Sequence, residues 1–250
     1  MDSIQQKQPV KIKKRKIIVF LWSLVPWICI GFGLHHFHSI FWSFFLYHGV
    51  CLLPAIIYNQ KHWRKHLDMP TWRELGILAA AAVAFSLCTF YTYSFFGDYL
   101  VDRGLALLSM YERGFHMSWF IPLSIYFCTI NPAMEELFWR GVVLNELCDN
   151  NEPIISVPGI WTNVAFACWH FLIIRLFVSP PFVPIAVIIV FSVGLYMSWL
   201  YRRRNSLILP ALYHAIVFDL AVAIILGMVL YMPIRPQEQQ QIAPLLHQLQ

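Results

Sequence analysis

Long runs without charged residues divide the chain into segments of membrane-spanning length. Residues 17–60 predict two helices with a turn near residues 35–39, and the first of them, 17–34, follows a basic stretch as a retained signal-anchor helix. About 20 apolar residues are enough to cross the hydrocarbon core of a bilayer. Four further apolar runs have about that length: 75–97, 153–174, 181–201 and 206–231.

Residues 114–147 predict one more crossing, and its form is open. An apolar helix begins within 114–134 and continues to about Leu147. It is either one long tilted helix or two pieces broken at Asn131-Pro132, because proline loses a helix hydrogen bond. With this crossing, the pattern predicts an all-α, polytopic helical membrane protein with about seven to eight transmembrane helices.

The composition points to the same class of protein. Of the 250 residues, 59% are hydrophobic and only 12% are charged, and the mean hydropathy is +0.60. A soluble domain carries about 25% charged residues, and a disordered chain combines low hydrophobicity with many charges. The composition therefore argues against a soluble protein and excludes a disordered one.

The basic residues indicate how the chain is oriented. They form three clusters beside apolar runs, within 11–16, 61–73 and 202–204. Such clusters can bind nucleic acid, but clusters that flank apolar runs fit the rule that cytoplasmic loops are positively charged. No nucleic-acid partner is therefore expected, and seven crossings place all three clusters on the cytoplasmic side.

The same count of crossings gives the domain organisation. Residues 1–16 are predicted to form a basic cytoplasmic tail, 17–231 a single helical membrane domain, and 232–250 a polar C-terminal tail on the outside. The sequence contains no internal repeat and no Gly/Ser linker. A second domain is therefore not expected.

Several charged or titratable residues stand out because they lie inside the predicted helices. A charged side chain at the bilayer centre costs at least about 2.5–3.5 kcal/mol on insertion scales. Such residues must pair with one another or line a wet cavity. The set comprises Glu135, Glu136, Arg140, His170, His214 and Asp219.

The two adjacent glutamates are expected to differ. Glu136 and Arg140 are four residues apart and share a helix face, so they can form an ion pair. Glu135 is rotated by about 100° and has no such partner in its own helix. An unpaired buried carboxyl group suits a general base or acid. A structural ion-pair network of all three residues is an equally open interpretation.

Two histidines favour the catalytic interpretation. His170 lies in the fifth predicted helix and His214 in the seventh, and both helices can face the helix of Glu135. One unpaired glutamate and two buried histidines suit an activated water and an oxyanion donor. The other histidines in apolar segments are interpreted as hydrogen-bonded core or interfacial residues: His35, His36, His38 and His48.

The order of these motifs resembles the CPBP family of intramembrane endopeptidases, the CAAX-protease and bacteriocin-processing group that is also called Abi. Glu135, Glu136 and Arg140 match the EExxxR motif. Phe166 and His170 match FxxxH, and His214 matches the histidine of the last helix. The resemblance covers roughly residues 115–231, which would form the catalytic core.

The resemblance implies a fold and a mechanism. The helices would surround a cavity within the bilayer, and Glu135, helped by His170, would activate water for attack on a peptide bond. His214 and a nearby Asn or Asp would stabilise the oxyanion or orient the water. The substrate would be a membrane-associated peptide or protein.

The sequence departs from the family at one position. The family usually has Asn or Asp four residues after the last histidine, but this chain has Phe218 there and Asp219 one residue later. On a regular helix Asp219 points about 140° away from His214. Either a π-bulge realigns it, or another group takes the role.

Metal use and two other functions remain as hypotheses. No cofactor is favoured, but Glu135, His170 and His214 are a possible zinc set, although the HExxH motif is absent. The alternatives to a protease are a non-catalytic immunity or scaffold protein and an ion-coupled transporter. The compact size and the lack of sorting signals favour the plasma membrane of a prokaryote over the endoplasmic reticulum.

Overall fold

The computed structural model describes residues 7–149 and 151–232. The predicted C-terminal tail therefore lies outside the described residues except for Met232, as do the first six residues of the basic tail. Within the described ranges the secondary structure is helical, and the only β pairing is an isolated bridge between Val101 and Val178. The prediction of an all-α protein is confirmed.

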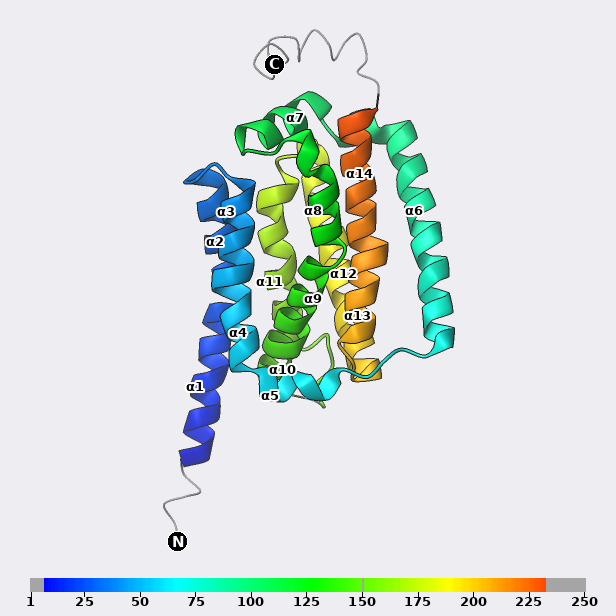
Figure 1. The fold of residues 1–250 in the computed structure, drawn as a ribbon. Helices are drawn as coiled ribbons and strands as arrows, with labels where there is room; N and C mark the ends of the chain where they lie inside the picture. Colours follow the sequence, from blue (N-terminus) through cyan, green and yellow to red (C-terminus); the bar gives the residue numbers. More distant parts are fainter. Residues whose placement is uncertain (1–6, 150, 233–250) are drawn as a thin grey trace.

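The helices run back and forth between two ends of an elongated bundle (Figure 1). In chain order the elements are α1 (Lys7–Trp22), α2 (Val25–His35), α3 (Ile40–Phe44), η1 (Phe45–Leu52), α4 (Leu53–Tyr58), α5 (Gln60–Trp63), η2 (Arg64–His66), α6 (Trp72–Leu100), α7 (Arg103–Glu112), η3 (Met117–Trp119), α8 (Phe120–Phe127), α9 (Ile130–Phe138), η4 (Trp139–Leu144), α10 (Asn145–Leu147), α11 (Val157–Ile174), η5 (Pro180–Phe182), α12 (Val183–Arg204), α13 (Ile208–Tyr213), η6 (His214–Asp219) and α14 (Leu220–Tyr231).

Six helical stretches in the described residues are long and apolar enough to cross a membrane, which confirms a polytopic membrane protein. They are Lys14–His35, Ile40–Tyr58, Trp72–Leu100, Val157–Ile174, Pro180–Arg204 and Ile208–Tyr231. The predicted crossing at 114–147 is not among them because it is divided into short helices. These helices, α8 to α10, still lead from the end of the bundle near α7 to the end near α5 (Figure 1).

The crossing is broken, as the second alternative predicts, but the break lies slightly before Asn131-Pro132. Helix α8 ends at Phe127, and α9 begins at Ile130 after a turn at Cys128 and Thr129. Pro132 has no N–H to donate to the carbonyl four residues before it, which is that of Cys128. The helix therefore opens one turn before the proline rather than at it.

The three basic clusters come together at one end of the bundle. Arg15 forms an ion pair with Glu146, and Arg202 donates from Nη2 to the carbonyl oxygen of Cys148 at 2.9 Å. Arg204 pairs with Glu74 at 2.7 Å. The same end carries α5 and the start of α13, while α7 lies at the opposite end (Figure 1). This arrangement agrees with the orientation that the positive-inside rule predicts.

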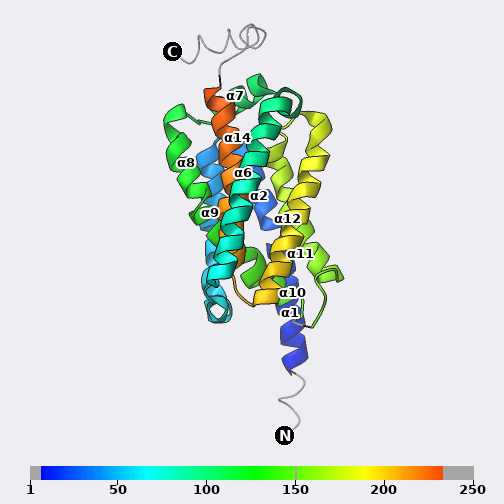
Figure 2. The same cartoon turned by 90° about the vertical axis from the view of Figure 1, so that its right-hand side faces the viewer.

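Helix α6 begins with a well-defined cap and lies on the outside of the bundle. Thr71 and Glu74 form a capping box, in which Glu74 Oε2 accepts from the Thr71 N–H at 2.8 Å. Figure 2 shows α6 lying across the face formed by α12 and α14. Much of its surface consists of exposed apolar side chains, such as Val83 and Phe95. An apolar outer surface is what a bilayer environment requires.

The most deeply buried part of the molecule surrounds α9 and η4. Phe138, Trp139 and Arg140 are all fully buried, and they pack between η1 and α11. A glutamate pair and an arginine thus lie in the middle of an apolar bundle. Because water is excluded there, these polar groups must form hydrogen bonds and ion pairs with one another.

Candidate active site

Three π-helical segments, η1, η4 and η6, carry several of the polar side chains in the interior: His48, Arg140, His214 and Asp219. A π-helix bonds residue i to residue i+5, so residues five apart come to the same face. In η6 this brings Asp219 Oδ1 within 3.5 Å of His214 Nε2. The first of the two alternatives, a π-bulge that realigns Asp219, is confirmed. Phe218 instead packs against Phe85 of α6, with ring centroids 5.5 Å apart.

Glu136 and Arg140 form the ion pair that their spacing predicts. Arg140 Nη1 lies 2.8 Å from Glu136 Oε1, and both side chains are fully buried. The guanidinium also donates to the carbonyl of Gly194 on α12 at 2.9 Å. It lies over the Phe166 ring, 4.7 Å from the centroid, in a cation–π contact. Arg140 therefore joins α9 and η4 to α11 and α12.

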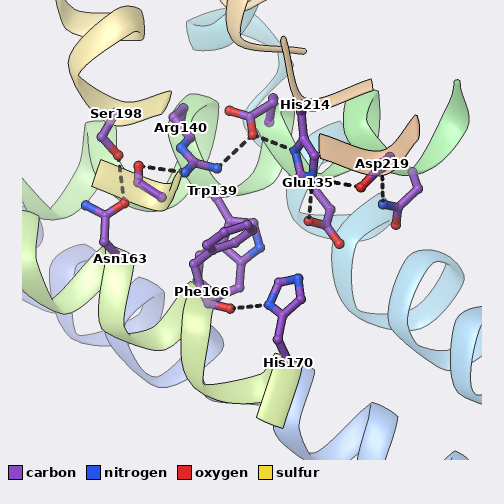
Figure 3. Close-up of polar contacts among 12 residues, drawn as sticks. Glu135, Trp139, Arg140, Asn163, Phe166, His170, Ser198, His214 and Asp219 are labelled. Carbon is purple, nitrogen blue, oxygen red and sulfur yellow. Dashed lines mark hydrogen bonds and ion pairs between the residues drawn. The ribbon is translucent and has the colours of Figure 1, made fainter. Parts of the chain in front are cut away.

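Glu136 also fixes the orientation of His214. The Nδ1 atom of His214 lies 2.9 Å from Glu136 Oε1. A carboxylate oxygen only accepts, so Nδ1 must donate. The opposite nitrogen, Nε2, then points to Asp219 and to Glu135 Oε2, which is 3.8 Å away (Figure 3).

Glu135 has a different set of neighbours from Glu136. Its Oε1 accepts a hydrogen bond from the Tyr47 hydroxyl at 3.1 Å, and that hydroxyl accepts from Trp139 Nε1 at 3.3 Å. Its Oε2 has no hydrogen-bond partner among the described residues. Glu136 Oε2 also lacks one, but the Arg140 cation already balances that carboxylate. Glu135 is thus the carboxylate with a free oxygen and no bonded arginine.

His170 lies near this group without joining it. Its Nδ1 is 2.8 Å from the carbonyl oxygen of Phe166, and its ring packs on Trp169 with centroids 3.8 Å apart. Since a carbonyl only accepts, Nδ1 donates and Nε2 of the neutral ring keeps a lone pair. In Figure 3 the ring points from α11 toward Glu135. No direct bond between the two side chains is present in the described structure.

A second hydrogen-bonded chain reaches Asp219 from the other side. Asn131 Nδ2 donates to Asp219 Oδ2 at 3.1 Å, and Asn131 Oδ1 lies 3.0 Å from His48 Nε2. The Tyr126 hydroxyl lies 2.7 Å from His48 Nδ1. His48 is buried and hydrogen-bonded, as a core histidine should be, but its partner Asn131 contacts a predicted site residue.

Three residues of this interior were not among the sequence candidates: Tyr47, His48 and Asn131. Asn131 could have been identified from the sequence, because it is a polar residue in an apolar run. It also lies four positions before Glu135, which places both side chains on the same helix face. Tyr47 and His48 belong to no motif. They reach the site only because η1 packs against α9.

The side chains in the described structure do not fit the zinc set. Zinc ligands converge to about 2.0–2.2 Å from the metal. His214 Nε2 lies 3.8 Å from Glu135 Oε2. The hydrogen bond of His170, however, goes to the backbone carbonyl oxygen of Phe166 in its own helix and not to either of these side chains. Among residues 7–149 and 151–232, no group of three or more His, Cys, Asp or Glu side chains is arranged to hold a metal ion.

An apolar hollow lies beside η6, whose Val217 and Phe218 form part of its wall. Its volume is about 460 Å³, and it lies between α6, α12 and the α13–η6 segment. It is lined by Ala81, Ala84, Phe85, Cys88, Tyr196, Tyr213, Val217 and Phe218. The segment that carries His214 and Asp219 therefore separates this hollow from the polar interior.

Comparison with known proteins agrees with the resemblance to the CPBP family that the sequence motifs indicate. Residues 117–218 match the family model described as Type II CAAX prenyl endopeptidase Rce1-like, which confirms that resemblance. The match contains Glu135, His170 and His214 and ends just before Asp219. No curated protein and no solved structure matches the chain. The match and the apolar helices support an intramembrane protease of the CAAX type in general, with a membrane-associated protein as substrate.

Proposed function

We propose that this chain, which resembles the type II CAAX prenyl endopeptidases over residues 117–218, cleaves a peptide bond near the C-terminus of a prenylated protein. One observation carries the mechanism. The Oε2 of Glu135 accepts no hydrogen bond and lies 3.8 Å from His214 Nε2, and the ring of His170 points toward Glu135 from another helix. An ionisable side chain inside a membrane protein is costly to bury and marks a functional position.

The water that attacks the substrate is held between Glu135 and His170. Glu135 Oε2 and His170 Nε2 are both acceptors, so one water molecule can donate one hydrogen to each. Its lone pairs then remain available for the carbonyl carbon of the scissile bond. Glu135 removes a proton from the water as the C–O bond forms, which is general base catalysis.

The same carboxyl group completes the reaction. The tetrahedral intermediate collapses when the C–N bond breaks, and the leaving amine needs a proton. Glu135 returns the proton that it took from the water, so the enzyme ends in its starting state. Tyr47 holds Oε1 throughout, which keeps Oε2 as the reactive oxygen.

His214 supports the negative charge that develops on the carbonyl oxygen. The chain from Arg140 through Glu136 fixes the His214 ring and points Nε2 into the site. Because Nδ1 donates to Glu136, Nε2 can also donate only when the ring is an imidazolium, a charge that the carboxylates of Glu135, Glu136 and Asp219 around it favour. A donor that is already oriented costs no rearrangement during the reaction. Asp219, 3.5 Å from Nε2, orients the ring from its other side.

The apolar hollow supports a lipid-bearing substrate. It lies next to η6, and its walls are mostly aliphatic and aromatic side chains. A prenyl chain in this hollow would bring the attached peptide close to His214. A prenylated substrate would place the protein in a eukaryotic endomembrane instead of the prokaryotic plasma membrane that the sequence favours.

The test is cleavage of a fluorogenic, farnesylated CAAX peptide by the purified protein in detergent. Glu135→Gln should lower kcat by about 10²–10⁴-fold, the usual contribution of a general base, while the unfolding temperature stays near wild type because Gln still accepts from Tyr47. Glu112→Gln, an exposed carboxylate on α7, is the matched control and should keep full activity.

Two outcomes would overturn the proposal. Full activity of Glu135→Gln would remove this residue as the base. Loss of cleavage with a chelator and recovery with added zinc would replace the glutamate mechanism by a metal mechanism. The displaced Asp219 was the feature that favoured a scaffold protein, and its position 3.5 Å from His214 Nε2 supports the protease instead.

A further inference from the structure

Asn131 is a buried amide on the same face of α9 as Glu135. It is 4% exposed, and the two residues are four positions apart, which places them one above the other on the helix. Its Nδ2 lies 3.1 Å from Asp219, whose other oxygen lies 3.5 Å from His214 Nε2. The amide therefore lies at the edge of the group that includes the proposed base and the proposed oxyanion donor.

The orientation of this amide follows from its neighbours. The carboxylate of Asp219 only accepts, so Asn131 must present its NH₂ group to Asp219 and its Oδ1 to His48. His48 Nε2 must then donate to Oδ1, and Nδ1 of the neutral ring is left with a lone pair. Nδ1 therefore accepts a hydrogen bond from the Tyr126 hydroxyl, 2.7 Å away. Without a hydrogen of its own, Nδ1 cannot donate to the Phe44 carbonyl oxygen, which lies 3.1 Å away.

The chain of donors thus has one direction, from Tyr126 through His48 and Asn131 to Asp219. It ends on an acceptor that has no hydrogen to donate. Asp219 itself therefore cannot stabilise an oxyanion, because two negative charges repel each other. The Nδ2 atom of Asn131 has two hydrogens, and in the described structure it uses one of them, on Asp219.

We propose that Asn131 is a catalytic residue that donates its second Nδ2–H to the oxyanion beside His214. His48 and Tyr126 are positioning residues, because they prevent the amide from rotating its oxygen toward the site. This inference rests on the proposed protease function. It adds three residues, Asn131, His48 and Tyr126, to the set that the sequence motifs identified.

The first test replaces Asn131 by a residue of similar shape that cannot donate. Asn131→Leu should lower kcat on the farnesylated peptide by about 10²–10³-fold, which is the usual loss for one oxyanion donor. KM should change less than threefold, because the donor binds charge that exists only in the transition state. Asn145→Leu is the matched control, because Asn145 is also on this crossing but bonds Gly141 and Tyr201.

A second test does not depend on the stability of the first variant. His48→Phe keeps a ring but removes both bonds, so the amide can rotate, and kcat should fall by about tenfold. His48→Gln restores a donor for Asn131 and an acceptor for Tyr126, and should recover most of that loss. A purely structural His48 would give equal activity in both variants per folded molecule, and that result would overturn the positioning role.

The outcomes separate this inference from the function on which it rests. If Glu135→Gln is inactive but Asn131→Leu cleaves within threefold of wild type, Asn131 is not the oxyanion donor and the protease proposal stands. If Asn131→Leu raises KM and leaves kcat unchanged, the amide binds substrate instead, and the inference is also wrong. If Glu135→Gln is fully active, the proposed function fails and the inference fails with it.

Discussion

Two halves of the polar interior meet at the adjacent residues Glu135 and Glu136, and they are built differently. On one side Glu136 is bonded to the permanent cation of Arg140, within the same helical segment. On the other side Glu135 is bonded to a neutral hydroxyl from Tyr47, 88 residues away. We call these the arginine side and the hydroxyl side.

The difference separates stability from reactivity. A carboxylate that is bonded to arginine has its charge balanced by that cation and holds its helix in place. A carboxylate that is held by a neutral donor keeps its capacity to take a proton. Two identical side chains, one position apart, can therefore serve as a structural brace and as a base.

The largest effect should follow from breaking the arginine side. Arg140→Met leaves Glu136 buried without its cation, and removing one partner of a buried ion pair costs about 3–5 kcal/mol. Thermal unfolding in detergent should show this as a large drop in the unfolding temperature. The double variant Arg140→Met/Glu136→Gln should recover part of the loss, because no unpaired charge remains. If Arg140→Met alone were as stable as the wild type, the Glu136–Arg140 ion pair would not stabilise the fold as proposed.

A smaller effect is expected on the hydroxyl side. Tyr47→Phe removes the donor to Glu135 Oε1, so either oxygen can turn toward the water, and kcat should fall by about tenfold while KM stays near wild type. Tyr201→Phe is the matched control, because Tyr201 is also buried and its hydroxyl bonds Asn145 at the end of the bundle that carries the basic clusters. Equal losses of kcat in the two variants would show that the Tyr47 bond has no special role.

These two sides also differ in how far the sequence predicts them. The Glu136–Arg140 pair follows from a spacing of four on one helix, so a local pattern is enough to find it. The register shift in η6 was foreseeable as well, because Asp219 reaches His214 only if residues five apart share a face. Both features depend on the geometry of a single segment.

The hydroxyl side was not predictable in the same way. Tyr47 and His48 lie in a segment with no motif, and they reach α9 through packing between elements that are more than 80 residues apart. No periodicity encodes such a contact. The helix break was foreseeable in kind but not in position, because Pro132 affects the carbonyl of Cys128 rather than its own turn.

The smallest effect should appear at Phe218, which faces the apolar hollow instead of either side of the polar interior. Phe218→Ala removes part of the wall, and losing about 1 kcal/mol of apolar contact would raise KM about fivefold for a farnesylated peptide. A peptide with a shorter geranyl chain should be affected less, and kcat should change little for both. Phe95→Ala, on the lipid-facing surface of α6, is the control. If both peptides lose equally, or if kcat falls instead, Phe218 acts through η6 on His214 and Asp219, and the hollow does not hold the lipid.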